Sequence, residues 1–138
     1  MQDDTIKPTG VVFILLRDDK KVLLQLRDGN DKKFPNTWCF PGGRKEGNES
    51  YVDTVLREAQ EEYEIVLTPE DCSLVTTYTI DGLVENNHVF VCSVGNQQPV
   101  LHEGADMKWV DVKGIQTLKL GFQQEKFVPE LMSYLDKT

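Results

Sequence analysis

Three carboxylates and an arginine stand within six residues of one another in the segment Gly42–Ile65 (GGRKEGNESYVDTVLREAQEEYEI), as Arg57, Glu58, Glu61 and Glu62. On a helix that advances about 100° per residue, the three glutamates fall within an arc of about 100° along one flank. Like charges three and four residues apart on a helix repel each other. A divalent cation would remove that repulsion, and hard cations such as Mg²⁺ and Mn²⁺ take oxygen ligands of this kind.

A solvated helix face is the alternative interpretation, and for a bare ExxEE pattern it is the better one. The pair Gly42-Gly43 favours a site, because glycine allows a backbone group to approach a ligand closely. The pair comes just before the helix, so a loop there can bring a carbonyl or amide group to the acidic flank. No serine or cysteine nucleophile stands beside a histidine in the sequence. These features predict metal-assisted attack of water on a phosphate chain.

The elements that must hold these residues are mostly strands. The run VVFILL is continuously apolar and partly β-branched, which is typical of a buried strand, and VLLQL follows it as a hairpin partner. The segment PGGRKEGNE is predicted to be a glycine-rich loop. The predicted strands are Val11–Leu16, Val22–Leu26, Trp38–Phe40, Ile65–Leu67, Leu74–Ile80, His88–Val94 and Lys108–Val112.

Two helices complete the predicted fold. Ser50 and Asp53 have the spacing of a capping box, which marks the start of the acidic helix. Apolar residues then recur at helical spacing and form one stripe: Val52, Val55, Leu56, Ala59 and Tyr63. The second helix is predicted over Phe122–Leu135, with an inner face of Phe122, Phe127, Leu131 and Leu135. Two helices can cover opposite faces of the sheet, so the pattern predicts an α/β sandwich.

Length and composition exclude several classes of protein. The 138 residues suit one domain, 1–138, that buries a real core. A net charge of −8 without a Lys/Arg run opposes non-specific binding to nucleic acid or to an anionic membrane. No apolar run approaches the length of a membrane span. The three cysteines form no CxxC motif, which favours reduced thiols and a cytoplasmic location. A monomer and a homodimer both remain open.

A longer pattern surrounds the acidic cluster. Five residues separate Gly43 from Glu49, seven separate Glu49 from Arg57, and the run REAQEEYEI follows. This resembles the Nudix box of the MutT-like hydrolases, GX5EX7REUXEEXGU, in which U is aliphatic; only Glu64 departs, where the box has glycine. The segments KKVLLQLRD, WCFPGG and HEGADMKWV also resemble the surroundings of the box. The match extends over many positions and is therefore specific.

The resemblance implies a fold and a reaction. The fold is a Nudix-type α/β/α sandwich, a mixed sheet with helices on both faces. The reaction is the hydrolysis, with Mg²⁺ or Mn²⁺, of the diphosphate bond in a nucleoside diphosphate linked to another moiety. The partner is then a small-molecule nucleotide, whose second moiety the sequence does not identify.

By position in the box, the resemblance implies roles for the acidic residues. Glu58 and Glu62 are the expected principal metal ligands, and Gly42 is an expected carbonyl ligand. Glu61 is expected either to bind a second metal or to activate water. Glu103 resembles a distant acidic residue that some members add as a ligand or base, and a solvated loop carboxylate is the equal alternative.

The other box positions are expected to support the site. Arg57 is expected to neutralise part of the cluster and to orient a carboxylate, and Glu49 to brace the loop through Arg57, with Gly43 as a motif position. A non-glycine residue in the left-handed conformation that ends such a helix costs roughly 1 kcal/mol. Glu64 therefore predicts that the helix runs on or closes differently.

Candidates for substrate binding are Arg27, Phe40 and Gln124. Arg27 ends the second strand, where some family members place a group that contacts the base or phosphates, and a surface ion pair is its equal alternative. Phe40 could stack on a base, although on a strand it is more often core. Gln124 opens the last helix at a place where nucleotide-cleaning members read the base. His88 is predicted to be structural, and His102 is undecided.

Two alternative functions remain at this point. A Nudix-like module could sense a nucleotide without cleaving it, although all three helix glutamates are present. An isopentenyl diphosphate isomerase shares the fold and uses a cysteine near Cys39, together with upstream histidines. No histidine precedes His88 in this sequence, which opposes the isomerase.

Overall fold

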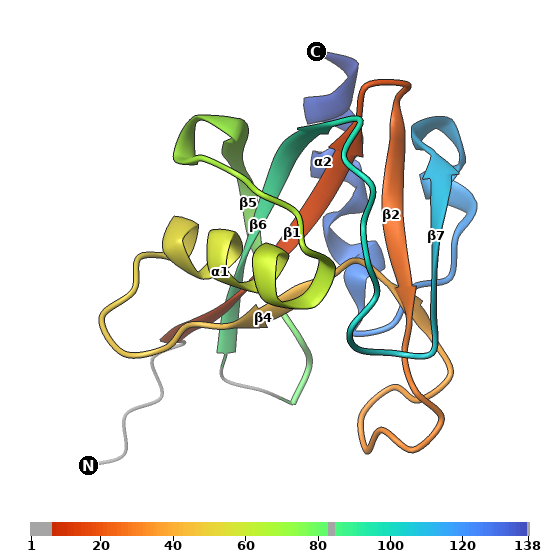
Figure 1. Cartoon of the computed structure of the whole chain (residues 1–138). Helices are drawn as coiled ribbons and strands as arrows, with labels where there is room; N and C mark the ends of the chain where they lie inside the picture. Colours follow the sequence, from red (N-terminus) through yellow and green to blue (C-terminus); the bar gives the residue numbers. More distant parts are fainter. Residues whose placement is uncertain (1–6, 83–84, 138) are drawn as a thin grey trace.

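The computed structural model describes residues 7–82 and 85–137, and its strands form one mixed sheet (Figure 1). Two α-helices accompany the sheet, α1 (Tyr51–Tyr63) and α2 (Val128–Asp136). The strands are β1 (Lys7–Arg17), β2 (Lys21–Leu26), β3 (Trp38–Cys39), β4 (Gly42–Arg44), β5 (Cys72–Thr79), β6 (Glu85–Gly95) and β7 (Asp106–Asp111). Three short 3₁₀ helices lie at Pro69–Asp71, Val112–Thr117 and Gln124–Phe127.

Strand β1 is at the centre of the sheet. The strand order is β3-β2-β1-β6-β5, with β4 also paired to β1 and β7 to β2. β1 runs parallel to β6 and antiparallel to β2 and β4. Successive side chains of β1 point to opposite faces, so Val12 and Ile14 enter one core and Val11, Phe13 and Leu15 the other. Burial on both faces explains why this strand is continuously apolar.

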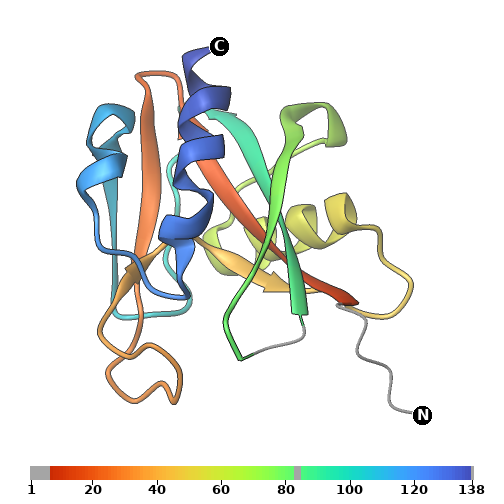
Figure 2. The same ribbon diagram turned by 180° about the vertical axis from the view of Figure 1, so that it is seen from behind.

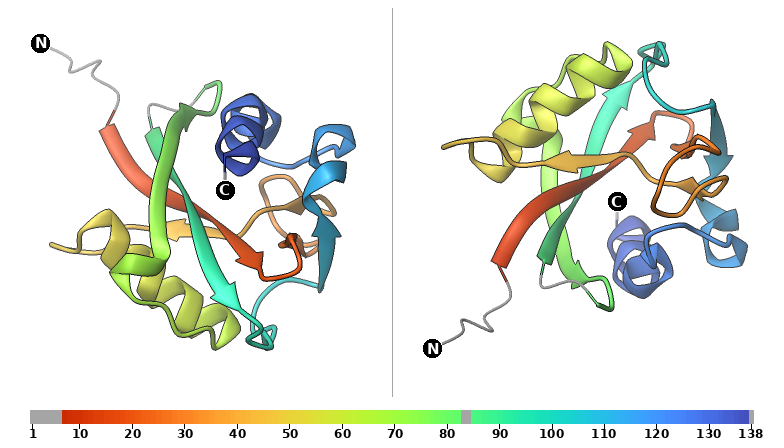
Figure 3. Two further views of the ribbon diagram at one scale, coloured as in Figure 1. Left: turned by 90° about the horizontal axis from the view of Figure 1, so that it is seen from above. Right: turned by 90° about the horizontal axis from the view of Figure 1, so that it is seen from below.

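Each face of the sheet carries one α-helix. The apolar residues of α1 pack with Phe13 and Phe90 on one face, and those of α2 pack with Ile14 and Val91 on the other. Figure 3 shows the sheet between the two helices, and Figure 2 brings α2 to the front. The predicted sandwich with helices on both faces is confirmed. No helix in residues 7–82 and 85–137 combines the length and apolarity needed to cross a bilayer.

The start of α1 is as predicted. The Asp53 amide donates to Ser50 Oγ at 3.0 Å, and the Ser50 amide donates to Asp53 Oδ2 at 3.2 Å. Of the predicted stripe, Val55, Ala59 and Tyr63 are fully buried. The cap and the stripe together fix where α1 begins and which face it turns to the sheet.

The end of α1 differs from the prediction. Glu64 takes the left-handed conformation, with φ 55° and ψ 33°, and its amide donates to Gln60 O at 3.0 Å. The Ile65 amide donates to Ala59 O at 3.1 Å. The helix neither runs on nor closes in another way, because Glu64 adopts the conformation that a glycine would supply.

The segment Ile65–Leu67 was predicted to be a strand, and this prediction is wrong. Ile65 and Leu67 are buried and Val66 is 64% exposed, which produces the alternation of a strand. The backbone of Val66 instead bonds to the side-chain amide of Gln97 through both its N–H and its C=O, each at 2.9 Å. A side chain thus takes the place of a neighbouring strand.

Two further predictions need correction. Part of the predicted glycine-rich loop is β4, which pairs with β1. The last helix does not begin at Phe122, because Phe122 and Gln123 both have positive φ, which a right-handed helix does not allow. A 3₁₀ turn follows at Gln124–Phe127, and α2 begins only at Val128. Phe127 and Leu131 are buried as predicted. The remaining strand boundaries differ from the predicted ones by no more than four residues.

Candidate active site

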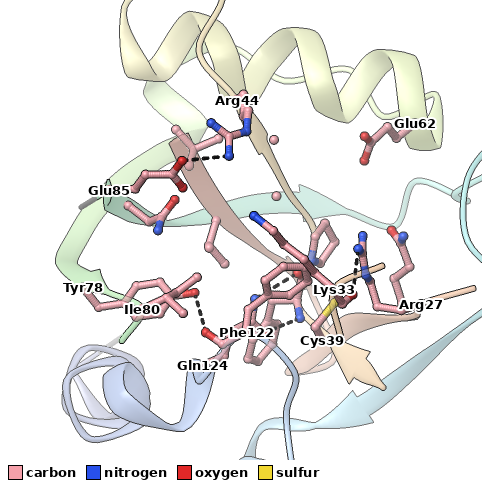
Figure 4. A pocket seen from close by; sticks show the side chains of 18 of the residues that line it. Arg27, Lys33, Cys39, Arg44, Glu62, Tyr78, Ile80, Glu85, Phe122 and Gln124 are labelled. Atoms are coloured by element: carbon pink, nitrogen blue, oxygen red, sulfur yellow. Dashed lines mark hydrogen bonds and ion pairs between the residues drawn. The ribbon is translucent and has the colours of Figure 1, made fainter. Parts of the chain in front are cut away.

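A cavity of about 380 Å³ opens between the C-terminal half of α1, strands β1 and β4, and the segment that precedes α2 (Figure 4). In Figure 4, Glu62 reaches toward it from α1, Arg44 and Glu85 border one side, and Arg27 and Lys33 border another. The remaining lining residues are Val11, Val12, Gln25, Cys39, Phe40, Pro41, Gly42, Gly43, Tyr78, Ile80, Asn87, Glu103, Phe122 and Gln124. The cavity therefore joins an acidic region to basic side chains.

The double glycine is required by close packing. A Cβ on Gly43 would lie 2.4 Å from Glu58 Cδ, and a Cβ on Gly42 would lie 2.7 Å from the carbonyl oxygen of Val11. Both residues belong to β4, which is pressed between β1 and α1. The short strand thus brings the backbone of Gly42 and Gly43 to the acidic flank, as the sequence predicted, although by strand pairing rather than by a loop.

Arg57 connects α1 to the segment before it. Its Nε donates to Glu49 Oε2 at 2.6 Å and its Nη2 to Glu49 Oε1 at 3.1 Å, a two-pronged pair. Nη2 also donates to the carbonyl oxygen of Arg44 at 3.0 Å. Nη1 lies 2.9 Å from Glu58 Oε1 and 3.3 Å from Glu61 Oε2. Arg57 therefore holds the segment after β4 against the helix and orients two of its carboxylates.

Glu49 completes this connection from the other side. Besides Arg57, its Oε1 accepts from the Glu46 amide at 2.9 Å and from Thr54 Oγ1 at 3.1 Å. The hydrogen bonds from Arg57, followed by that from the Glu46 amide, lower the pKa of Glu49 from 4.5 to about 2. The predicted brace between Glu49 and Arg57 is present in the structure.

The Glu49 pair should make stability depend on pH. A carboxyl whose folded pKa lies below its unfolded value stabilises the protein above the unfolded pKa, and this contribution is lost as pH falls through the folded pKa. We expect Glu49→Gln to lower the free energy of unfolding at pH 7, and the difference from wild type to shrink between pH 4.5 and about 2. Urea titrations of chelator-treated protein measure it. Glu130→Gln, at an exposed site on α2, is the control, and a difference for Glu49→Gln that is constant over this range would contradict the prediction.

Glu62 lies between two other carboxyl groups. Burial, with Glu58 and Glu103 hydrogen-bonded beside it, raises the pKa of Glu62 from 4.5 to about 9. Glu58 is only 12% exposed, whereas Glu61 is 60% exposed and pairs with Arg57. The structure therefore brings Glu58, Glu62 and Glu103 together. Glu62 and Glu103 line the cavity, whereas Glu58 and Glu61 do not.

The donor set fits a hard divalent cation. Carboxylate oxygens from Glu58, Glu62 and Glu103, with the backbone of Gly42 on the same cavity wall, are the ligand type that Mg²⁺ and Mn²⁺ take. In the described part of the chain no three acidic, histidine or cysteine side chains already stand in a metal-holding arrangement. Glu58 accepts from Arg57 Nη1 through Oε1, which leaves its second oxygen available to a cation.

The predicted substrate residues all line the cavity, but they differ in how far their side chains are already engaged by other residues. The Arg27 guanidinium lies over the Phe122 ring at 4.7 Å and donates to the carbonyl oxygen of Lys33 at 3.1 Å. Phe40 is 1% exposed and packs on Phe127, so little of its ring faces the cavity. Gln124 uses its amide on the Phe40 backbone, accepting at 2.7 Å and donating at 3.3 Å.

Sequence reasoning missed three charged residues of the cavity. Arg44 Nη2, on β4, lies 2.8 Å from Glu85 Oε1, on β6, and Lys33 reaches in from the 27–37 segment (Figure 4). Arg44 could have been noticed because it directly follows the double glycine. No local signal points to Lys33 or Glu85, because only the folded chain places their segments at the cavity.

The cysteine and histidines do not form a nucleophilic site. Burial raises the pKa of the Cys39 thiol to about 11, which disfavours the thiolate. His88 stacks on Tyr51 with ring centroids 4.0 Å apart, in keeping with a structural role. His102 lies 2.6 Å from Glu64 and next to Glu103 in sequence.

Comparison with known proteins identifies the family. The model of the NUDIX domain matches residues 7–131. The chain belongs to the Nudix family. The uncharacterized Nudix hydrolase YvcI of Bacillus subtilis is 33% identical over 113 residues, which are 78% of this Nudix chain and 68% of that protein.

Other relatives differ in the length that is shared. The ADP-ribose pyrophosphatase of Methanocaldococcus jannaschii is 28% identical over 94% of this chain and 76% of its own. The m7GpppN-mRNA hydrolase NUDT17 of Danio rerio is 40% identical over 65 residues, and the match spans only 22% of that protein. Among solved structures, a MutT protein from Methanosarcina mazei superimposes with a TM-score of 0.77 at 21% identity, over 99% of this chain and all of that one. The Nudix fold is therefore shared in full.

Proposed function

We propose that this Nudix protein hydrolyses the diphosphate bond of a nucleoside diphosphate linked to another moiety, by attack of water at phosphorus, with Mg²⁺ or Mn²⁺ as cofactor. The observation that carries the proposal is Glu62, which lies between Glu58 and Glu103 at a cavity that also contains basic side chains. Two relatives are named for cleaving compounds of this class, ADP-ribose and capped mRNA. These names support the class of substrate and leave the second moiety open.

The residues of the chain divide the work. Glu58 and Glu62, with the Gly42 carbonyl, are the proposed ligands, and Glu61 is the proposed ligand of a second cation. A bound divalent cation supplies charge neutralisation and a more acidic water. Glu103 accepts the proton of the attacking water, and Glu61 is the alternative base. Arg57 fixes the helix carboxylates, and Arg27, Lys33 and Arg44 attract the phosphate chain.

Two other functions are less well supported. A sensing module without catalysis has no need of the carboxyl group that Glu103 adds beside Glu62. A cysteine-dependent isomerase needs a reactive thiol, and the buried Cys39 has a raised pKa. We also propose a cytoplasmic location, because Cys39, Cys72 and Cys92 are all free thiols.

A substrate panel tests the proposed function. The protein is incubated with Mg²⁺ and ADP-ribose, a nucleotide sugar, a dinucleoside polyphosphate, an oxidised nucleoside triphosphate or a capped oligonucleotide, and products are identified by mass spectrometry. We expect a nucleoside monophosphate or diphosphate from at least one compound, with ¹⁸O from labelled water on phosphorus. Binding without any cleavage would favour the sensing module. Cleavage that disappears on alkylation of the wild-type protein, but persists when a Cys39→Ala variant is treated in the same way, would show that the reagent only blocks the cavity. Cleavage that is also lost in untreated Cys39→Ala would favour thiol chemistry.

Glu103→Gln separates the two candidate bases. Because Glu103 lies on an exposed segment, its replacement should leave the melting temperature of the metal-free protein nearly unchanged. If Glu103 takes the proton, the turnover number should fall about 10²-fold or more and the Mg²⁺ requirement should shift. Steady-state kinetics at saturating Mg²⁺ decide the matter. A turnover number within about twofold of wild type would return the role of base to Glu61.

A further inference from the structure

The one residue that departs from the Nudix box, Glu64, adopts a conformation that its side chain disfavours. Its φ of 55° is left-handed, a conformation that is unfavourable for a residue with a Cβ atom. Glycine at this position would end α1 with the same backbone bonds and without that cost. The closure of the helix therefore does not explain a glutamate here.

The Glu64 carboxylate reaches the neighbour of Glu103. Glu64 Oε2 lies 2.6 Å from His102 Nε2, and the side chains are 51% and 47% exposed. A carboxylate only accepts hydrogen bonds, so the imidazole nitrogen donates in this pair. Exposed pairs contribute little to stability, a factor of about five in the folding equilibrium at most. The contact therefore offsets the backbone cost of Glu64 at best, and adds little net stability.

The backbone around His102 is tied to the same end of the helix. The His102 amide donates to Glu62 O at 3.1 Å, and the Val100 amide donates to Tyr63 O at 2.9 Å. The Ala105 amide donates to Leu26 O at 2.9 Å, which attaches the far end of the segment to β2. Residues 100–105 thus run from the end of α1 to the end of β2, with Glu103 between the attachment points.

A buried contact supports this segment from below. A Cβ on Gly104, whose φ is +85°, would lie 2.8 Å from Gln25 Nε2 and 2.9 Å from the carbonyl oxygen of Leu26. The Tyr63 hydroxyl, which is fully buried, donates to Gln25 Oε1. The Gly104 backbone therefore packs closely against Gln25 and the end of β2. The Glu64–His102 pair adds a side-chain contact that ties this segment to the end of α1.

We propose that Glu64 is a positioning residue, which through His102 holds the Glu103 carboxyl beside Glu62. The effect on catalysis rests on the proposed function, because it needs Glu103 to act in hydrolysis. The effect on the segment does not, because it concerns only contacts within the metal-free protein. At this position, glycine would give a helix end without backbone strain, whereas Glu64 supplies a carboxylate that restrains residues 100–105.

Four single variants and one double variant, Glu64→Gly with His102→Ala, test the proposal. Glu64→Gly removes the carboxylate and suits the left-handed backbone, and Glu64→Asn also suits it but is too short to reach His102. Glu64→Gln keeps the length and an acceptor oxygen, and His102→Ala removes the partner. Each is examined for melting temperature, for hydrogen exchange of amides 102–106 without metal, and for kcat and KM with the compound that the wild type cleaves.

Glu64→Gly and Glu64→Asn should melt at or above the wild-type temperature. Their amides 102–106 should exchange about 2- to 5-fold faster, the factor that corresponds to an exposed ion pair. Their kcat should fall by a similar factor, about 2- to 5-fold, with little change in KM, because Glu103 spends less time beside Glu62. Glu64→Gln should retain most of the wild-type kcat and most of the protection from hydrogen exchange. Adding His102→Ala to Glu64→Gly should lower kcat and protection no further.

Wild-type exchange and kcat in Glu64→Gly would overturn the proposal, and so would faster exchange with an unchanged kcat. Additive losses in the Glu64→Gly, His102→Ala double variant would also overturn it. A wild-type protein that cleaves nothing in the panel would refute the proposed function instead. In that case, an unchanged rate of hydrogen exchange in Glu64→Gly would also refute the restraint of residues 102–106 by Glu64. Faster hydrogen exchange would support that restraint without a role in catalysis.

Discussion

Removal of divalent cations should abolish hydrolysis, and Mg²⁺ or Mn²⁺ should restore it. The physical reason is the concentration of carboxyl groups at the cavity, where burial and the neighbours Glu58 and Glu103 raise the pKa of Glu62 to about 9. An anionic phosphate chain is repelled by such a cluster unless a cation neutralises it. The measurement is the rate of product formation after treatment with excess chelator and after stepwise return of each metal.

The control for this experiment separates loss of the cofactor from loss of the fold. The melting temperature of the chelated protein should stay well above the assay temperature, because neither hydrophobic core includes the acidic side chains that would bind the cation. The metal series should favour cations that prefer oxygen ligands. Undiminished turnover in excess chelator would refute the metal-dependent mechanism.

Glu62→Gln should lower the turnover number about 10²- to 10⁴-fold, the range for a group that helps to activate the attacking water, because Glu62 is a proposed ligand of the cation that makes this water more acidic. The substitution keeps the shape of the side chain and removes one carboxyl group from between Glu58 and Glu103. Metal-free Glu62→Gln should therefore be as stable as wild type or more so, while its affinity for Mn²⁺ falls. Kinetics, thermal unfolding and titration of the metal-free protein with Mn²⁺ measure the three effects.

Two comparisons make the result specific. Glu130→Gln changes the same charge on the exposed side of α2 and should leave all three quantities unchanged. Glu61→Gln removes a carboxylate that is 60% exposed and outside the cavity lining, so it tests the proposed second metal or base directly. A folded Glu62→Gln variant with a wild-type rate would show that the acidic flank is only solvated surface. An unfolded one would show that Glu62 is structural.

The acidic helix could be predicted in detail because its signals are local. The capping box of Ser50 and Asp53, the apolar stripe and the 3.6-residue period all lie within a few turns of chain. The same locality explains why Glu49 could be assigned to Arg57 from the box alone. The apolar run at β1 likewise predicted a strand, since burial on both faces leaves no polar position in it.

Local signals failed where the partner of a segment lies far along the chain. Ile65–Leu67 alternates like a strand, but its backbone partner is the side chain of Gln97. The glycine-rich segment was predicted to be a loop, although β4 pairs there with β1. The pattern of Ile65–Leu67 describes its burial correctly. For both segments, only the fold decides which groups satisfy the backbone hydrogen bonds.

The sequence by itself determined the family pattern, the two helices and the side of α1 that carries the carboxylates. The tertiary structure decided which of these carboxylates meet, because Glu103 approaches Glu62 only after residues 100–105 are attached to both α1 and β2. It also decided that Glu64 would take a left-handed backbone and reach His102. Periodicity and capping depend on residues that are close together in the sequence, so they can be recognised there. The charge and shape of a cavity depend on contacts between segments that are far apart in the sequence, and no local pattern indicates which of these segments will meet.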